Sequence, residues 1–339
     1  MKTVLHIGPA NTPGGMASVI QVLSSNPPDG WRAEIIQTSG GTLISKFLRW
    51  VSAKSELKKY IVHDKVKIVH IHVTHSLSWW RKRSLMRTCE KYGIPTLIHI
   101  HSGKFEKFCS GIAGTSVTRE LAKKNRKTII LENRWKGILS KWLPDNVEVV
   151  NNCSFPIGNR NNHKTGKEIS LLLLSRKSKI KGHEFAIKIL ERLVGRGHEV
   201  KLIMTGITNI EVSKEYSEMI ETLGWVETEN KAELVERADF LISPSEFEGS
   251  SMSVIEAMVS GLPCIVSAAS SETVVSEKFV IESNNPEDWA ERIIDLYGRD
   301  EYLKAVEETL ENSRLYHVDL CVNKFGRIYE DMLGSNYGN

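Results

Sequence analysis

The sequence predicts an α/β protein with two doubly wound parallel sheets, each in its own domain. Short aliphatic or β-branched runs alternate along the chain with longer runs of helical spacing, and the short runs are too apolar for a sheet with one wet face. The alternation stops once, at a polar stretch over residues 155–168, and then restarts. With 339 residues, 41% of them hydrophobic and 25% charged, the chain has material for two cores.

The first half has the strand and helix order of a buried parallel sheet. Predicted strands cover residues 3–8, 33–38, 66–73, 95–101, 128–131 and 147–152, and predicted helices cover residues 15–25, 43–62, 78–93 and 135–143. We therefore place an N-terminal domain at residues 1–155 and a linker at residues 156–168.

The second half repeats the pattern without repeating the sequence. Predicted strands cover residues 169–175, 199–206, 239–245 and 263–267, and predicted helices cover residues 184–197, 215–224, 253–261 and 285–298. These elements form a C-terminal domain at residues 169–315. In the last segment, residues 316–339, one apolar stripe at helical spacing predicts a helix that needs a surface to pack on. The stripe consists of Val318, Cys321, Val322, Phe325, Ile328, Tyr329 and Met332.

The net charge of +4 is unevenly distributed. Residues 1–150 carry 24 Lys and Arg against 10 Asp and Glu, a net +14, and the rest of the chain carries 21 against 31, a net −10. A basic half points to an anionic partner, such as a membrane surface, a phosphate-bearing acceptor or nucleic acid. The alternative is a solvated, lysine-rich surface.

Cysteine usage and hydropathy indicate a cytoplasmic protein. The five cysteines are scattered and have no C-x-x-C spacing, so neither a disulfide framework nor a zinc site is expected. No apolar run approaches the length that spans a bilayer, and the apolar N-terminal run is too short for a signal peptide.

Residue types suited to anion binding follow several predicted strands, where ligands of open α/β sheets bind. After the first strand, Gly14 and Gly15 precede a helix, so backbone amides and the positive helix end can approach an anion or a hydroxyl-rich ligand. A plain tight turn is the alternative. After the strand at 169–175, Arg176 and Lys181 could clamp a diphosphate, or could form an ordinary basic surface loop.

A third group follows the strand at residues 239–245. Gly249, Ser250, Ser251 and Met252 lead into a helix, and their amides could cradle a phosphate. Glu248 precedes these residues and Glu256 lies in the helix, so the two carboxylates could hold the hydroxyls at the two ends of a sugar nucleotide. Alternatively, both are glutamates favoured by the dipole at a helix start.

Together these motifs resemble the retaining GT-B glycosyltransferases of family 4, the glycosyltransferase group 1. "PSEFEGSSMSVIEAMVSGLPCIVS" is similar to the signature with two glutamates separated by seven residues, "SRKSKIKG" to the G-R-x-x-x-x-K-G element, and "VVNNCS" to the hinge of that family. The resemblance covers nearly the whole chain. It implies two Rossmann-like domains that face a central cleft, with a C-terminal helix that crosses back to the N-terminal domain.

The resemblance implies roles for the second-half residues. Arg176 and Lys181 would neutralise the donor diphosphate and the charge that develops on the leaving group. Glu256 would bind the nucleotide ribose. Glu248 would bind the donor sugar, assisted by amides of Ser250 to Met252.

In the first half, His101 matches the histidine that contacts the donor sugar, and Gly15 matches the loop near the phosphates and the acceptor. The implied reaction transfers a sugar with retention at the anomeric carbon and requires neither a metal nor a cofactor beyond the nucleotide-diphosphate sugar. Ser175 replaces the usual glycine before Arg176, and "EGSSM" replaces commoner sequences. These departures leave the donor sugar and the base open.

Histidines cluster on two predicted strands. His70 and His72 share a face of one strand and His75 follows them, but without a nearby carboxylate or cysteine we do not expect a metal site there. His99 shares a face with His101, and the choice of His101 rests on the family resemblance and on its place at the strand exit.

The acceptor is expected to be a saccharide or a lipid-linked saccharide in polysaccharide or glycoconjugate synthesis. Residues 46–60 and 79–92 combine aromatic side chains with Lys and Arg, as helices at membrane interfaces do. This predicts peripheral contact with an anionic membrane, and the alternative is two amphipathic helices with aromatic core residues. Other readings of the whole chain are a GT-B-like sugar-nucleotide epimerase and a non-catalytic protein that binds an anionic ligand. No nucleic-acid module is recognised.

Overall fold

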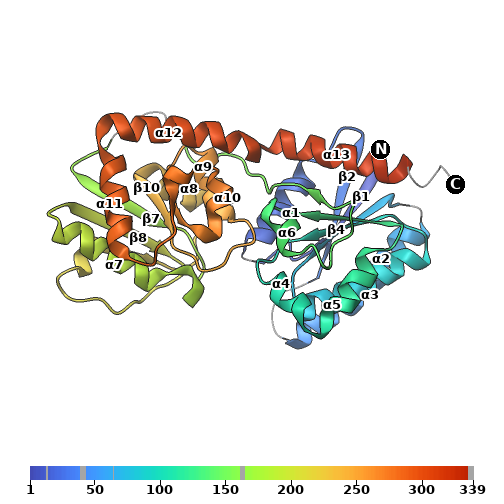
Figure 1. The fold of residues 1–339 in the computed structure, drawn as a ribbon. Coiled ribbons are helices and arrows are strands. Elements are labelled where there is room, and N and C mark those ends of the chain that lie inside the picture. Colours follow the sequence, from blue (N-terminus) through green and yellow to red (C-terminus); the bar gives the residue numbers. More distant parts are fainter. Residues whose placement is uncertain (13, 39–42, 64, 161–164, 335–339) are drawn as a thin grey trace. The chain divides into compact units, whose positions relative to one another are not determined.

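The chain folds into two compact units. The computed structural model describes residues 1–12, 14–38, 43–63, 65–160 and 165–334 (Figure 1). The first unit comprises Met1–Cys153 and Val318–Asn339, and the second comprises Ser154–His317. Two stretches of the expected domain plan, 161–164 in the linker and 335–339 in the last segment, lie outside the described residues.

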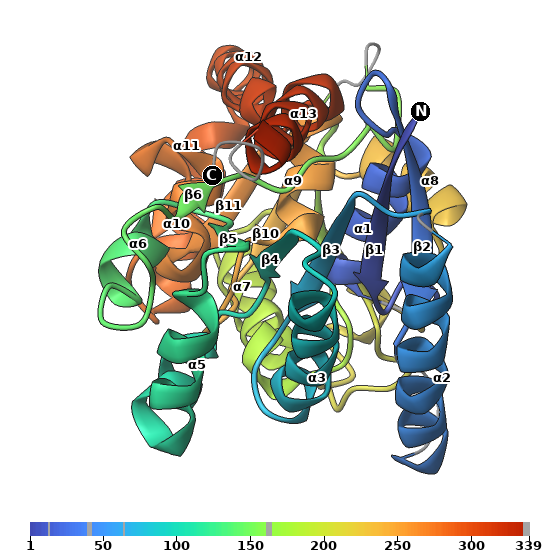
Figure 2. The same ribbon diagram turned by 90° about the vertical axis from the view of Figure 1, so that its right-hand side faces the viewer.

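The first unit contains a six-stranded parallel sheet in the order β2-β1-β3-β4-β5-β6. Every residue of β3 and β4 is buried, as expected for a sheet with helices on both faces. Figure 2 shows α2, α3 and α5 alongside this sheet. The strands are β1 Lys2–Gly8, β2 Trp31–Gln37, β3 Ile68–Val73, β4 Thr96–Ile100, β5 Arg126–Ile130 and β6 Glu148–Val149, and the helices are α1 Gly15–Ser25, α2 Leu43–Val62, α3 Leu77–Lys91, α4 Phe105–Phe108, α5 Gly114–Leu121, α6 Arg134–Ile138 and α13 Val318–Gly334.

The second unit contains another six-stranded parallel sheet, in the order β12-β11-β10-β7-β8-β9. The predicted pair of doubly wound parallel sheets is thus confirmed. The strands are β7 Glu168–Leu173, β8 Glu199–Thr205, β9 Ile220–Leu223, β10 Phe240–Ser243, β11 Cys264–Ser267 and β12 Val280–Ile281, and the helices are α7 His183–Gly195, α8 Thr228–Arg237, α9 Met252–Val259, α10 Ser271–Val274, α11 Pro286–Tyr297 and α12 Arg299–Ser313.

The predicted helix at residues 215–224 is wrong. Ser217–Met219 form a single 3-10 turn, and Ile220–Leu223 form β9 at the edge of the sheet. Each residue of this strand is half-buried, so its sequence lacks the continuous apolar run that identified the central strands. The helix of this region is α8, whose composition is mostly polar, and α12 also escaped prediction.

The last helix, α13, packs on the first unit, as the sequence predicted. Tyr329 is buried against Trp31, with ring centroids 5.0 Å apart, and its hydroxyl lies 2.9 Å from Nδ1 of His70. Glu330 on the same helix accepts a hydrogen bond of 3.0 Å from the indole nitrogen of Trp31 and pairs with Lys2. The apolar stripe of this helix is therefore part of the core of the first unit.

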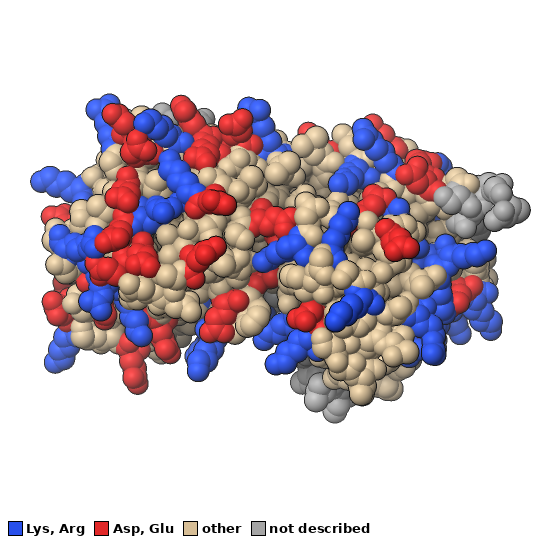
Figure 3. All heavy atoms as spheres, in the orientation of Figure 1, with Lys and Arg blue, Asp and Glu red and all other residues tan. Residues whose placement is uncertain are grey.

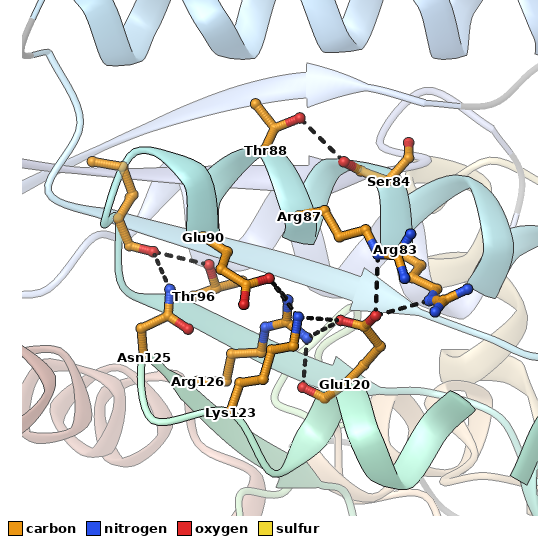
Figure 4. Close-up of polar contacts among 11 residues, drawn as sticks. Arg83, Ser84, Arg87, Thr88, Glu90, Thr96, Glu120, Lys123, Asn125 and Arg126 are labelled. Atoms are coloured by element: carbon orange, nitrogen blue, oxygen red, sulfur yellow. Dashed lines mark hydrogen bonds and ion pairs between the residues drawn. The ribbon is translucent and has the colours of Figure 1, made fainter. Parts of the chain in front are cut away.

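Part of the positive charge of the first unit is used inside the fold. The carboxylate of Glu120 on α5 is fully buried and meets Arg83 and Arg87 of α3 and Arg126 of β5 (Figure 4). Burial alone would raise the pKa of this carboxyl, but the hydrogen bonds from Arg126 and Arg83 outweigh it and lower the pKa to about 2. Lys123 also approaches this carboxylate. The cluster links α5, α3 and β5 through ion pairs rather than through apolar contacts.

The packing of α13 predicts a large stability loss for Tyr329→Ala. Removing a fully buried aromatic ring that contacts Trp31 and His70 should cost about 3 to 5 kcal/mol of unfolding free energy, measured by urea denaturation. Leu320→Ala is the matched control, because Leu320 lies on the same helix with 56% exposure, and should change stability by less than about 0.5 kcal/mol. Equal losses in the two variants would contradict this packing.

Candidate functional site

In the second unit, two loops that follow β7 and β10 lie against each other. The amide of Glu246 donates to the carbonyl of Ile180 at 2.9 Å. Gly182 has φ +75°, and a Cβ at this position would lie 2.7 Å from the carbonyl oxygen of Pro244, so only glycine fits without strain. The first loop is thereby held against the second at the carboxyl ends of their strands.

This contact brings together two predicted site residues. Nζ of Lys181 forms an ion pair with Oε1 of Glu248, and the two side chains are only 15% and 11% exposed. Arg176 is exposed at the exit of β7, on the same loop as Lys181. The structure therefore joins the predicted diphosphate clamp to the carboxylate predicted to bind sugar.

The second carboxylate lies in α9. Glu256 is 5% exposed, and its Oε2 lies 2.8 Å from Nζ of Lys231 on α8. Sequence reasoning missed Lys231, because α8 itself was not predicted and nothing in its polar sequence marks one lysine. Each of the two predicted carboxylates is thus paired with a lysine from another element.

The N-terminus of α9 lies between the two carboxylates in the sequence. Ser251 precedes the helix in an extended conformation without a side-chain cap, and the first amides of a helix have no acceptor within it. Oγ of Ser250 is buried and has no hydrogen-bond partner among the described residues. Because buried hydroxyls are normally paired, this end of the helix is suited to a ligand that supplies hydrogen-bond acceptors. Gly249 precedes Ser250 and Ser251, and Met252 is the first residue of α9.

In the first unit, the glycine loop follows β1. Gly14 has φ +138°, which favours glycine, and the amide of Ala17 donates to its carbonyl at 2.9 Å. Gly15 is the first residue of α1. The predicted loop-to-helix arrangement is therefore present, with an uncapped helix start.

His101 follows β4 directly and belongs to a stack of five histidines. Its amide donates to the carbonyl of Val73 at 2.9 Å, and its Nε2 lies 2.9 Å from Nδ1 of His72. Burial and the positive charge of Lys82 lower the pKa of His101 to about 3. Because Lys82 is itself buried, its pKa falls to about 7, and its ammonium donates to the carbonyl of His72.

The other members of the stack are His6, His70, His72 and His99. Burial lowers the pKa of all four buried histidines, that of His6 to about 3. Sequence reasoning noticed the alternation in β3 and β4 but missed His6, because only the register of β1 on β3, which pairs His6 with His70, brings it into the group. His75 lies apart from the stack, with Nδ1 2.7 Å from Oγ of Ser102.

The second unit is similar to a family of known proteins. Residues 168–299 match the family model described as glycosyl transferases group 1. An uncharacterised glycosyltransferase of Methanocaldococcus jannaschii is 30% identical over 146 residues, which are 42% of this chain and 40% of that protein. The chain thus spans less than half the length of this relative.

Solved structures resemble the chain over its whole length. Sucrose-phosphate synthase from Thermosynechococcus elongatus matches with a TM-score of 0.77 and 15% identity over 99% of this chain and 100% of that one. HepE from Anabaena, in a complex with UDP-glucose, matches with a TM-score of 0.72 and 12% identity over 98% and 100%. Because the sequence identity is so low, the similarity to these structures establishes a shared fold and nothing more.

The histidine stack predicts that stability falls with acidification. An unfolded histidine binds a proton below its ordinary pKa of 6.5, whereas folded His6 and His101 remain neutral down to about pH 3. The contribution of these two histidines to the free energy of unfolding is therefore fully present above pH 6.5. It declines as the pH falls from 6.5 to about 3, by up to about 1.4 kcal/mol per pH unit for each histidine.

Urea denaturation at a series of pH values between about 7.5 and 5 tests this. His6→Asn should reduce the slope of unfolding free energy against pH. His63→Asn, at an exposed histidine of the same unit, should leave the slope as it is. If the unfolding free energy of the wild-type chain does not change over this pH range, the buried imidazoles are not held neutral and the prediction is wrong.

Proposed function

We propose that this chain, whose residues 168–299 match the family model described as glycosyl transferases group 1 and whose fold resembles that of a solved sucrose-phosphate synthase, is a retaining glycosyltransferase. It moves a sugar from a nucleotide-diphosphate donor to a saccharide or lipid-linked saccharide acceptor in polysaccharide or glycoconjugate synthesis. The observation that carries this proposal is the pairing of Lys181 with Glu248 beside the N-terminus of α9.

The proposed donor site uses the two joined loops of the second unit. The diphosphate lies on the amides of Gly249 to Met252 and meets Arg176 and Lys181. Charge-assisted hydrogen bonds of this kind contribute about 1.5 to 3 kcal/mol each. Glu256 accepts the ribose hydroxyls, and Glu248 accepts hydroxyls of the sugar.

In the transfer step the bond between the anomeric carbon and the β-phosphate oxygen breaks. The acceptor hydroxyl forms the new bond on the same face of the sugar and passes its proton to the departing phosphate oxygen. Negative charge grows on the departing diphosphate. In the proposed site Arg176, Lys181 and the positive end of α9 stabilise that charge, so the reaction needs no metal ion. By the family resemblance, His101 and Gly15 of the first unit would contact the sugar and the phosphates.

We also propose that α2 and α3 of the first unit contact an anionic membrane. Phe47 and Leu48 on α2 and Leu77 on α3 are 57%, 61% and 65% exposed, and Lys and Arg gather over these helices (Figure 3). Trp79, in contrast, is fully buried, so only part of the aromatic pattern is available to a surface. Within the described residues no helix is long and apolar enough to cross a membrane.

The donor site predicts selective stabilisation by one nucleoside diphosphate. Thermal unfolding is measured with UDP, GDP, ADP, CMP and free phosphate, where a ligand at about 100 times its Kd adds roughly 2.7 kcal/mol. Lys181→Ala and Glu256→Ala should each weaken binding, by about 10- to 100-fold for the lysine. Lys188→Ala, at an exposed position of α7, is the control and should bind normally.

If no nucleotide stabilises the wild-type chain, or if both site variants respond as it does, the donor site is wrong. Products formed from the donor alone distinguish a transferase from an epimerase, because an epimerase converts its sugar nucleotide without an acceptor.

The membrane contact predicts co-sedimentation with vesicles that contain phosphatidylglycerol, and weaker binding as salt rises, since each nearby Lys or Arg adds about 1 kcal/mol. Phe47→Ser combined with Leu48→Ser should reduce binding. Leu303→Ser, at a 53% exposed leucine of the second unit, should not. Equal binding to neutral phosphatidylcholine vesicles would refute the proposal.

A further inference from the structure

Five imidazoles meet inside the first unit because of strand register. His6 of β1 pairs with His70 of β3, and His72 of β3 pairs with His99 of β4. Side chains two residues apart on a strand share a face. The rings of His70 and His72 therefore stack with their centroids 4.3 Å apart, and the ring centroids of His99 and His101 lie 3.9 Å apart.

Three of these rings form one hydrogen-bonded chain. Nδ1 of His6 lies 3.1 Å from Nε2 of His72, and Nδ1 of His72 lies 2.9 Å from Nε2 of His101. His72 thus uses both of its ring nitrogens on other histidines. The second nitrogen of His101, Nδ1, is the end of this chain that can face a ligand.

The other two rings form a separate chain. The hydroxyl of Tyr329 lies 2.9 Å from Nδ1 of His70, and Nε2 of His70 lies 3.2 Å from Nδ1 of His99. Nε2 of His99 is buried and has no partner among the described residues. This chain lies in the same stack but does not include His101, so it offers a matched control.

Neutral rings restrict where the protons of the first chain can be. A neutral imidazole has one N–H donor and one bare acceptor nitrogen, and burial keeps these rings neutral at pH 7. Both hydrogen bonds are then satisfied only if His6, His72 and His101 all carry the proton on Nδ1, or if all three carry it on Nε2. The tautomer of each ring fixes the tautomers of the other two.

We propose that His72 and His6 are positioning residues that determine which ring nitrogen of His101 carries the proton. With the proton on Nδ1, His101 offers a donor to a bound sugar hydroxyl, and with the proton on Nε2 it offers an acceptor. The coupling is a property of the first unit alone, and its effect on sugar binding rests on the proposed function. It gives the buried histidines a role in specificity, because a hydrogen bond made by one ring nitrogen sets the state of the other.

The ring orientations favour this role over metal binding. Ligand nitrogens of two histidine triplets lie within 4.8 Å of one another. However, the planes of His72, His99 and His101 are tilted by 32° to 38° to one another, and His72, which belongs to both triplets, directs both of its ring nitrogens at other histidines. While these hydrogen bonds are made, His72 has no ring nitrogen left for a metal ion.

The test is NMR of full-length protein with ¹⁵N-labelled histidine at neutral pH, with resonances assigned by replacing one histidine at a time. In wild-type protein His6, His72 and His101 should share one tautomer. In His70→Phe they should still share it. In His72→Phe, which keeps an aromatic ring in the stack, His6 and His101 should lose the shared state and each show a mixture.

Opposite tautomers at His6 and His101 in wild-type protein would overturn the proposal, as would a His101 tautomer that His72→Phe leaves unchanged. The functional effect is measured with UDP-glucose as the probe donor. His72→Phe should lower kcat about 10- to 100-fold relative to His70→Phe, the range seen when a residue that orients a metal-binding histidine is removed. Equal losses would indicate a merely structural stack. Absence of activity in wild-type protein would count against the donor, while the NMR result still decides the coupling.

Discussion

All described strand pairs in both sheets are parallel, and this constraint determines where polar residues can gather. In a parallel sheet every loop after a strand opens at the same edge. Residues from distant parts of the sequence therefore meet at that edge in each unit, as Lys181 and Glu248 do after β7 and β10. Central strands such as β3 and β4 are buried and leave little polar surface of their own. The candidate chemistry is consequently confined to strand exits.

Each of the two predicted carboxylates of the second unit is paired with a lysine without a ligand. Lys181 pairs with Glu248 and Lys231 pairs with Glu256, and each of the four side chains is at most 16% exposed. A partly buried charge without a partner is costly, whereas a paired one is tolerated. In the proposed donor complex, a diphosphate would compete with Glu248 for Lys181 and release its carboxylate for sugar hydroxyls. Lys181 would then pair with Glu248 in the free protein and with the diphosphate in the complex, where Glu248 would accept hydrogen bonds from the sugar.

The sequence predicted secondary structure correctly where one segment carries a periodic pattern over many residues. The bounds of α1 and α2 match the predicted 15–25 and 43–62, because an amphipathic period over eleven or more residues is a strong signal. It failed at β9, where four half-buried residues carry no clear period. Glu248, Glu256 and Lys181 were found as motifs, but the Lys231 contact and the chain from His6 to His101 depend on packing and on strand register. Neither can be read from spacing along one segment.

The buried histidines are not a requirement of the fold. The second unit builds a central strand of its own sheet, β7, with Ile169, Leu171, Leu172 and Leu173 at its buried positions. That sheet also has six parallel strands, although their order differs. Burying an imidazole costs free energy unless its polar atoms are paired, so aliphatic side chains would serve packing in β3 and β4 at lower cost. The histidines instead pair with one another across β1, β3 and β4 and end at His101, at the exit of β4. A polar core whose hydrogen bonds lead to one strand exit accords with the proposed role of His6 and His72 in positioning the proton of His101.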